Sequence, residues 1–538
     1  MKFRLAAAVV ALAALCTACV DIDYNLGGNL VPGNQMFTIH TADIPVTEFA
    51  LQSPDSLTGY SSRRITIGAV RDNVFGLSTR SCALALVPMN PKMDFGENPE
   101  FVSFHFSSEL DTVSVENASQ ECILQNIRVY ELTRPIRTGA DHGGLEDQPH
   151  GTTSIVRGSP VINGSDSLSF DFTEEYGRRF LTLTDEEKSD YSKYIQKFPG
   201  IYIETEAPAG MGGRINIFKL QFDYDSSNGY FLGNYAILQT RGTYDGVVKD
   251  SLFCFFLGAD NFYKSDSLLT NSATGIFPQY ALNIQSCTTR ETPRIEGDIL
   301  VEGGGAPKPV VSATYLRDIV RNAIKAEIRK EMPDISPAEL EDLASKAVVN
   351  KATLILPYEV PERFDAFAEV LSPTVRYTTD NSAIFMNITD AASSDENQGD
   401  INLGTRSYRP DITYHLQAIL DQSADQPVSS NYDVWLLIKK YEKLTTNAST
   451  QSINDYYQQL AYQNYYYQMY GYGGSGSYGY NDYYSNYYYW SAMNSSASTS
   501  STQTQLLLDQ DRYYRTVLNG TEAGRHPMLE LTYSLPID

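Results

Sequence analysis

Short segments in which apolar residues alternate with polar ones, or in which β-branched and aromatic residues gather, recur along this chain of 538 residues. Four of them are Ile123–Leu132, Leu168–Phe172, Ile201–Glu204 and Ile215–Tyr224, and Gly, Pro, Asn and Asp bound them. A period of two places every second side chain on the same face of a strand. These segments therefore predict half-buried antiparallel strands and a mainly β fold.

The pattern changes to that of helices between Gly303 and Pro357. The apolar residues of the first predicted helix recur at helical spacing and are Leu316, Ile319, Val320, Ala323, Ile324 and Ile328. A second helix is predicted to follow, because Ser336, Pro337 and Glu339 supply an N-cap, a first-turn proline and the capping-box partner of the cap. We therefore expect a short helical pair.

This helical segment, residues 306–350, is predicted to separate two β-rich units, residues 36–305 and 351–538. The sequence GGGAPKP directly before it is typical of a connection. The units also repeat each other weakly, since Asp171-Phe172-Thr173 in the first matches Asp411-Ile412-Thr413 in the second. We expect two antiparallel β-sandwich units of jelly-roll type. Chance similarity between unrelated sandwiches is the alternative explanation of the repeat.

The second unit is predicted to carry a Tyr-rich insertion at about 441–524, because the first unit has only a turn at the corresponding place. The centre of the insertion, Tyr456–Trp490, holds 15 of the 38 tyrosines, and Asp482 is its only charge. No period of 2.0 or 3.6 organises these tyrosines, so they are not predicted to be core. The segment is either a disordered low-complexity loop or a contact surface, for which tyrosine is well suited.

The first residues have the layout of a secretory signal. Two basic residues precede the apolar run Leu5–Leu15, which is too short to span a membrane, and small residues lead to a cysteine. We expect residues 1–18 to be removed as a signal peptide and a lipid to be attached to Cys19 rather than Cys16. Residues 19–35 would then form the lipid anchor and a tether.

The net charge is -24, and no stretch gathers Lys and Arg into a basic stripe. Nucleic-acid binding depends on such cations, so we expect no nucleic-acid partner. Cys82, Cys122, Cys254 and Cys287 remain besides the anchor. Outside the cytoplasm they can pair as disulfides, or they are buried thiols that act as small apolar side chains. The sequence leaves both possibilities open.

The sequence offers little that indicates catalysis. His142 and His150 share a loop with Glu146 and Asp147, but their spacing matches no zinc template. The other histidines are isolated, which is typical of structural residues: His40, His105, His415 and His526. The motifs G-x-S-x-G, G-x-x-x-x-G-K and H-E-x-x-H are missing from the sequence. We predict a protein that is not an enzyme and that has no catalytic residue, cofactor or metal site.

Four features together carry a family resemblance: Cys19 with its acidic followers, Ile67–Ser81 (IGAVRDNVFGLSTRS), Gly200–Glu204 (GIYIE) and His526–Ser534 (HPMLELTYS). With them the chain resembles a family of large Bacteroidota outer-membrane lipoproteins that carries a domain of unknown function. Some members look like accessory surface lipoproteins of the outer-membrane β-barrel assembly machinery.

The resemblance implies a non-enzymatic lipoprotein of the outer membrane, facing the cell exterior, that is a subunit of a multiprotein complex. Its implied partners are outer-membrane β-barrel proteins and other surface lipoproteins. An alternative function is that of a glycan-binding surface lipoprotein, in which exposed Tyr and Trp side chains stack on sugar rings. The periplasmic face of the membrane also stays open as a location.

The lipid anchor can be tested by substitution. We expect Cys19→Ala to move the protein from the membrane fraction to the soluble fraction, because the acyl chains supply the apolar contact with the bilayer. Fractionation and mass spectrometry of the amino-terminal peptide measure this. A variant that stays in the membrane and carries its lipid at residue 16 would contradict the assignment of Cys19.

Overall fold

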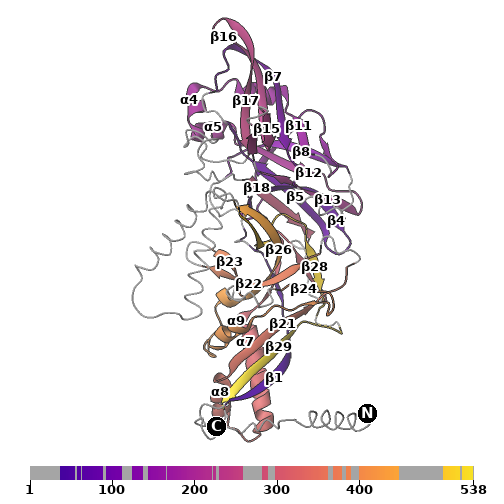
Figure 1. Ribbon diagram of the computed structural model, residues 1–538, viewed down its shortest axis with the longest axis vertical. Helices are drawn as coiled ribbons and strands as arrows, with labels where there is room; N and C mark the ends of the chain where they lie inside the picture. Colours follow the sequence, from indigo (N-terminus) through magenta and orange to yellow (C-terminus); the bar gives the residue numbers. More distant parts are fainter. Residues whose placement is uncertain are drawn as a thin grey trace, which may run out of the picture.

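Antiparallel strands dominate the structure, which confirms the predicted mainly β fold. The computed structural model describes residues 37–54, 57, 59–61, 64–88, 93–111, 124–136, 143–164, 167–220, 222–225, 230–257, 281–288, 297–361, 367–378, 383–388, 399–446, 501–520 and 524–536. These residues form two β-sandwich-like cores that follow one another along an elongated body (Figure 1).

The first core lies between two antiparallel sheets, and its buried side chains come from residues between Ile65 and Ala281. One sheet contains β3 (Tyr60–Ser61), β4 (Arg64–Asp72), β5 (Gly76–Leu84), β8 (Gln125–Leu132), β9 (His150–Ser154), β10 (Val161–Ile162), β12 (Ile201–Thr205), β13 (Gly212–Lys219) and β18 (Ala281–Cys287). The other contains β6 (Leu86–Pro88), β7 (Glu97–Ser108), β11 (Leu168–Asp171), β16 (Tyr235–Tyr244) and β17 (Val247–Leu257). A separate hairpin joins β14 (Phe222–Asp225) to β15 (Tyr230–Gly233).

Three short helices that the sequence did not predict cover one side of the first core. They are α3 (Glu174–Phe180), α4 (Asp185–Ser189) and α5 (Tyr191–Lys197). The hydroxyl of Thr173 caps α3, and Phe180 is fully buried against Phe198, with ring centroids 3.8 Å apart. Helices of five to seven residues are too short to show a period, so only their caps could have indicated them.

The second core draws its buried side chains from both ends of the chain. One sheet has the order β1-β29-β21-β25-β24, and the other contains β2, β20, β26, β22 and β23 with β27 beside β26. Their bounds are β1 (Phe37–Pro45), β2 (Ala50–Gln52), β20 (Lys308–Val311), β21 (Val348–Pro357), β22 (Val370–Thr378), β23 (Ala383–Asn387), β24 (Ile401–Asn402), β25 (Ser407–Tyr408), β26 (Val434–Thr446), β27 (Ser501–Leu508) and β29 (Met528–Pro536). The pair β19 (Ile299–Glu302) and β28 (Arg515–Leu518) completes this part.

The predicted helical pair is confirmed as α7 (Ala313–Glu331) and α8 (Pro337–Ser345). The apolar face of α7 is buried in the second core, and the hydroxyl of Ser336 accepts the backbone N–H of Glu339 in the expected capping box. A further helix, α9 (Thr413–Leu420), and a 3-10 turn (Ser430–Tyr432) were not predicted. The two Asp-x-Thr segments that suggested a repeat each lead directly into a short helix, α3 or α9.

Several boundaries differ from the predicted ones. The predicted strand Ile215–Tyr224 is divided between β13, which pairs with β4, and β14, which pairs with β15, and Leu220 between them is buried. The strand β1, placed by sequence in the first unit, pairs along its whole length with β29 near the end of the chain. These partners are far apart in the sequence, so a local sequence pattern cannot predict their pairing.

The predicted insertion, about 441–524, overlaps paired strands of the fold. It includes β27, which pairs with β26 from Lys439↔Leu508 to Thr446↔Ser501, and β28, which pairs with β19. Tyr513 and Tyr514, which lie between β27 and β28 in the sequence, are buried. The central segment Tyr456–Trp490 lies outside the described residues.

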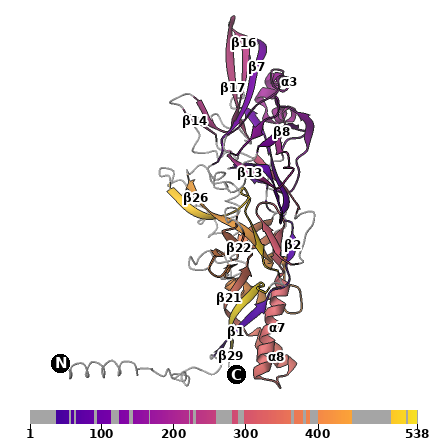
Figure 2. The same cartoon turned by 90° about the vertical axis from the view of Figure 1, so that its right-hand side faces the viewer.

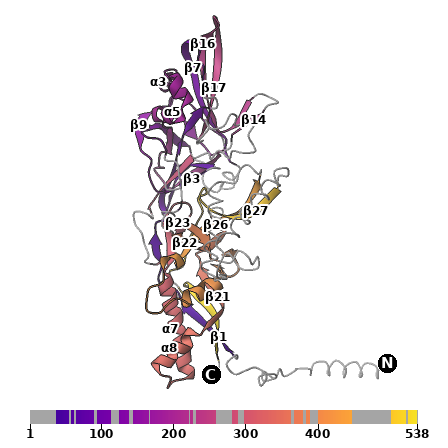
Figure 3. The ribbon, with the colours of Figure 1, turned by 90° about the vertical axis from the view of Figure 1, so that its left-hand side faces the viewer.

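The two ends of the body are distinct (Figures 1 to 3). β1, β29 and α8 lie at one end, and the hairpin formed by β16 and β17 projects at the opposite end. The first described residue, Phe37, therefore lies far from this hairpin.

The pairing of β26 with β27 makes a clean deletion possible. Replacing residues 447–500 by Asn-Gly should leave the free energy of unfolding within about 1 kcal/mol of its original value, because Thr446 and Ser501 are already direct partners and Asn-Gly suits a two-residue hairpin. Urea unfolding measures it. A large fall in stability would show that the tyrosines belong to the folded core.

Candidate functional site

The two cores meet at a buried guanidinium. Arg64 on β4 donates to Asp111 over 2.9 Å and to Glu442 on β26 over 2.5 Å, and it lies 3.7 Å from Asp511. Its side chain is only 9% exposed. Burial alone would lower the pKa of Arg64, but the hydrogen bond to Glu442 and the surrounding carboxylates hold it above its usual range. One cation thus joins the first core to the second.

Further polar contacts continue this junction. Buried Glu302 on β19 accepts from Ser78 of β5 over 2.8 Å and from Gln285 of β18 over 3.2 Å. Arg515 on β28 lies 3.0 Å from Asp72 at the end of β4. These three contacts join the first core to strands β19 and β28. This pair of strands therefore packs directly against the first core.

Several titratable groups at the junction have pKa values moved by burial. Burial lowers the pKa of Lys308, whose ammonium donates to the carbonyl oxygen of Glu302, to about 8. Burial raises the pKa of Glu302, and it raises the pKa of Asp509 to about 7. Such shifts also occur in structural ion networks, and their position between two packed cores indicates that role here.

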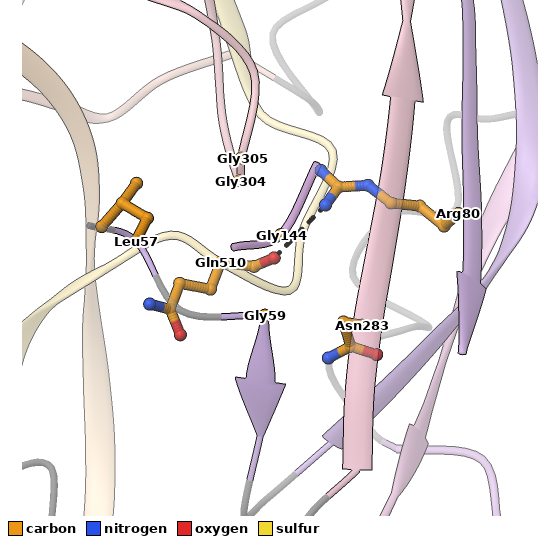
Figure 4. A pocket seen from close by; sticks show the side chains of 8 residues that line it. All are labelled: Leu57, Gly59, Arg80, Gly144, Asn283, Gly304, Gly305 and Gln510. Atoms are coloured by element: carbon orange, nitrogen blue, oxygen red, sulfur yellow. Dashed lines mark hydrogen bonds between the residues drawn. The ribbon is translucent and has the colours of Figure 1, made fainter. Parts of the chain in front are cut away.

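A small pocket opens beside this network, and Figure 4 shows the side chains around it. Its volume is about 20 Å³, and its lining residues are Leu57, Gly59, Arg80, Gly144, Asn283, Gly304, Gly305 and Gln510. Arg80 donates from Nη1 to the carbonyl of Gln510, whereas its Nε and Nη2 have no hydrogen-bond partner among the described residues. Gly304 has a φ of +64°, and a Cβ there would lie 2.5 Å from this guanidinium.

The pocket has the size of one or two water molecules, and a cavity of this kind needs polar partners such as the Arg80 N–H groups. Its lining offers no nucleophile and no carboxylic acid. We therefore interpret it as a hydrated part of the junction rather than a substrate site.

The sequence-predicted site residues have different outcomes. Cys19 and Cys122 lie outside the described residues, as does the tyrosine segment Tyr456–Trp490. The three other cysteines, Cys82, Cys254 and Cys287, are buried thiols. Burial raises the pKa of both Cys82 and Cys254, which disfavours the reactive thiolate.

The described histidines have structural surroundings. His150 lies between the rings of Tyr130 and Tyr202, at centroid distances of 5.0 and 4.1 Å, while its loop neighbour His142 is outside the described residues. His415 is fully buried, its Nε2 lies 2.8 Å from the carbonyl oxygen of Tyr432, and burial lowers its pKa to about 4. Within the part of the chain that the structure describes, no three His, Cys, Asp or Glu residues gather as metal ligands.

The projecting hairpin presents a second surface that sequence reasoning missed. Asp245 and Gly246 form its two-residue turn with φ values of 52° and 80°, as a type I′ turn requires. β17 pairs with β6 only through Phe255–Leu257. Along Val247–Cys254, its outer edge has no strand partner among the described residues.

Apolar side chains flank this edge, which we call the β17 edge (Val247–Cys254). Val247, Val248 and Leu252 are 59, 64 and 64% exposed. Val248 and Leu252 lie on one face, with Asp250 between them in an ion pair with Arg241. A strand edge with unpaired N–H and C=O groups and exposed apolar residues can add an extended segment of another polypeptide.

None of the described helices is long and apolar enough to cross a membrane. Comparison of the chain with protein-family models gives no match, and comparison with curated proteins gives no similar relative either. The surfaces above are therefore interpreted from their own chemistry.

The junction can be tested through Arg64. Arg64→Met should destabilise the protein by about 3–5 kcal/mol, because it removes the cation and leaves buried carboxylates without it. Arg128→Met is the matched control, since the Arg128–Glu206 pair is exposed, and should change the melting temperature little. Thermal unfolding measures both. Equal effects of the two variants would contradict a central role for Arg64.

Proposed function

We propose that the protein is a lipid-anchored, non-enzymatic subunit of a multiprotein outer-membrane complex. Its partners would bind at the end of the body that carries the β17 edge. The single observation that carries this proposal is the β17 edge itself. The edge lies at one end of the body, and β1 lies at the opposite end (Figure 1). The expected anchor at Cys19 precedes β1 in the sequence, so the β1 end is the one nearer to the membrane. A partner can therefore reach the β17 edge without approaching the membrane-proximal end.

The chemistry of the edge favours a polypeptide partner. Backbone pairing along Val247–Cys254 supplies affinity for any extended segment, and the exposed side chains of Val248 and Leu252 select for apolar residues on one face. Long-range charge attraction adds little, because the net charge is -24 and no basic patch in the sequence balances it. Short-range apolar and backbone contacts should dominate.

The tyrosine segment Tyr456–Trp490 remains a predicted second contact surface. Tyrosine and tryptophan contribute strongly to interfaces, and Asp482 is the only charge that favours solvation of this segment. In the glycan-binding alternative, Tyr and Trp side chains of this segment would stack on sugar rings instead.

The proposal is tested by replacing two exposed apolar side chains on the β17 edge. The double variant Val248→Lys, Leu252→Lys should recover about tenfold less outer-membrane partner in a mild-detergent purification, since edge lysines oppose strand addition and hot-spot contacts are of this size. Leu403→Lys is the matched control, because Leu403 directly follows β24 and is 63% exposed. It should leave recovery unchanged.

Quantitative mass spectrometry of the co-purified proteins measures the result, with membrane association of each variant checked first. Equal recovery from the double variant and the control would overturn the role of the edge. A protein that purifies alone and binds a defined sugar would support the glycan-binding alternative instead.

A further inference from the structure

The outer face of the sheet formed by β1, β29 and β21 is unusually apolar at one end. The inner face of these strands packs on helices through residues such as Leu531 and Tyr533, so the outer face points away from the core. On that outer face Phe37, Ile39 and Val348 are 49, 69 and 47% exposed. We call these three residues the terminal patch.

The strand register places the terminal patch in adjacent rows. Ile39 of β1 lies opposite Ser534 of β29, which in turn lies opposite Val348 of β21. Phe37 pairs with Pro536 in the row nearer to the end of the strands. The patch residues therefore lie on β1 and β21, on either side of Ser534 in the central strand β29, although they come from distant parts of the sequence.

The outer face becomes polar farther along the same strands. The next row contains Thr41, Thr532 and Lys351, and the row after it contains Asp43 and Glu530. Residues two apart in a strand are separated by about 7 Å, so the apolar rows extend over a depth of about 7 Å. This matches the 5–10 Å to which interfacial segments enter the boundary between lipid headgroups and acyl chains.

The position of the patch in the chain indicates what covers it. Phe37 is the first described residue, and residues 20–36 connect it to the expected lipid-bearing Cys19. A fully extended chain of this length spans at most about 60 Å. The bilayer that receives the lipid is therefore within reach of the patch.

We propose that the terminal patch contacts the lipid bilayer and holds the long axis of the body upright on the membrane. This inference rests on the lipid anchor of the proposed function. A protein partner is a poorer fit, because three side chains expose on the order of a few hundred Å², whereas a stable interface takes about 800 Å² from each partner. A membrane interface requires no such area when a lipid chain already supplies the attachment.

The contact can be measured with tryptophan reporters in the full-length lipidated protein. Trp490→Phe removes one native tryptophan, and the other, Trp435, is buried in the second core. Ile39→Trp then places a reporter in the patch, and Val348→Trp places a second one on a different strand. Val248→Trp on the β17 edge is the control at the opposite end of the body.

The proteins are reconstituted into vesicles of phosphatidylethanolamine and phosphatidylglycerol, with or without bromine on the acyl chains. Brominated lipid should lower the emission of the reporters at 39 and 348 at least about twofold, because bromine quenches only at close range and the patch enters the acyl boundary. The reporter at 248 should keep its emission.

Unquenched reporters at 39 and 348, on protein that still floats with the vesicles, would overturn the patch contact and leave the anchor standing. A blue shift without quenching would show that protein covers the patch, and it would overturn the contact too. If the protein isolated from cell membranes carries no lipid on Cys19, both this inference and the anchor on which it rests are overturned.

Discussion

The ion pairs of buried Arg64 are the interaction on which the architecture depends. The two sheets of the first core pack on each other without help from the second core. Arg64 on β4 nevertheless binds Glu442 on β26, a strand of the second core. Because separating this guanidinium from Glu442 would leave a buried charge uncompensated, the ion pairs favour one relative position of the two cores. The apolar contact of Tyr513 with Val70 and Ile215 excludes water beside the ion pairs and strengthens them. The elongated shape follows from this junction.

The second core depends on a different constraint, which is the meeting of the two chain ends. β1 pairs with β29, and β29 with β21, so the sheet cannot form until the last strand has been made. The helix α7 then covers the inner face of these three strands with its own apolar side. Contacts this distant in sequence fold slowly, whereas the first core closes mainly within itself.

The local parts of this fold could be predicted, and the non-local parts could not. Alternation indicated β8, β11 and β12, and the capping residues Ser336 and Glu339 placed α8, because these signals act within a few residues. The pairing of β1 with β29 has no local signal. For the candidate surfaces, Asp245-Gly246 was an available turn signal, whereas the meeting of Arg64 with Glu442 depends on tertiary structure alone.

The arrangement of apolar surface along the body then has a physical rationale. Soluble proteins bury their large apolar residues, and an exposed group of them persists where something else covers it. Two of the exposed groups lie at opposite ends, Phe37 and Ile39 at the start of β1 and Val248 and Leu252 on β17. The buried charges of the junction lie between these two ends. Under the proposed function, a body built in this way would separate the membrane contact from the polypeptide contact, so that the anchor and a partner would not compete for one surface.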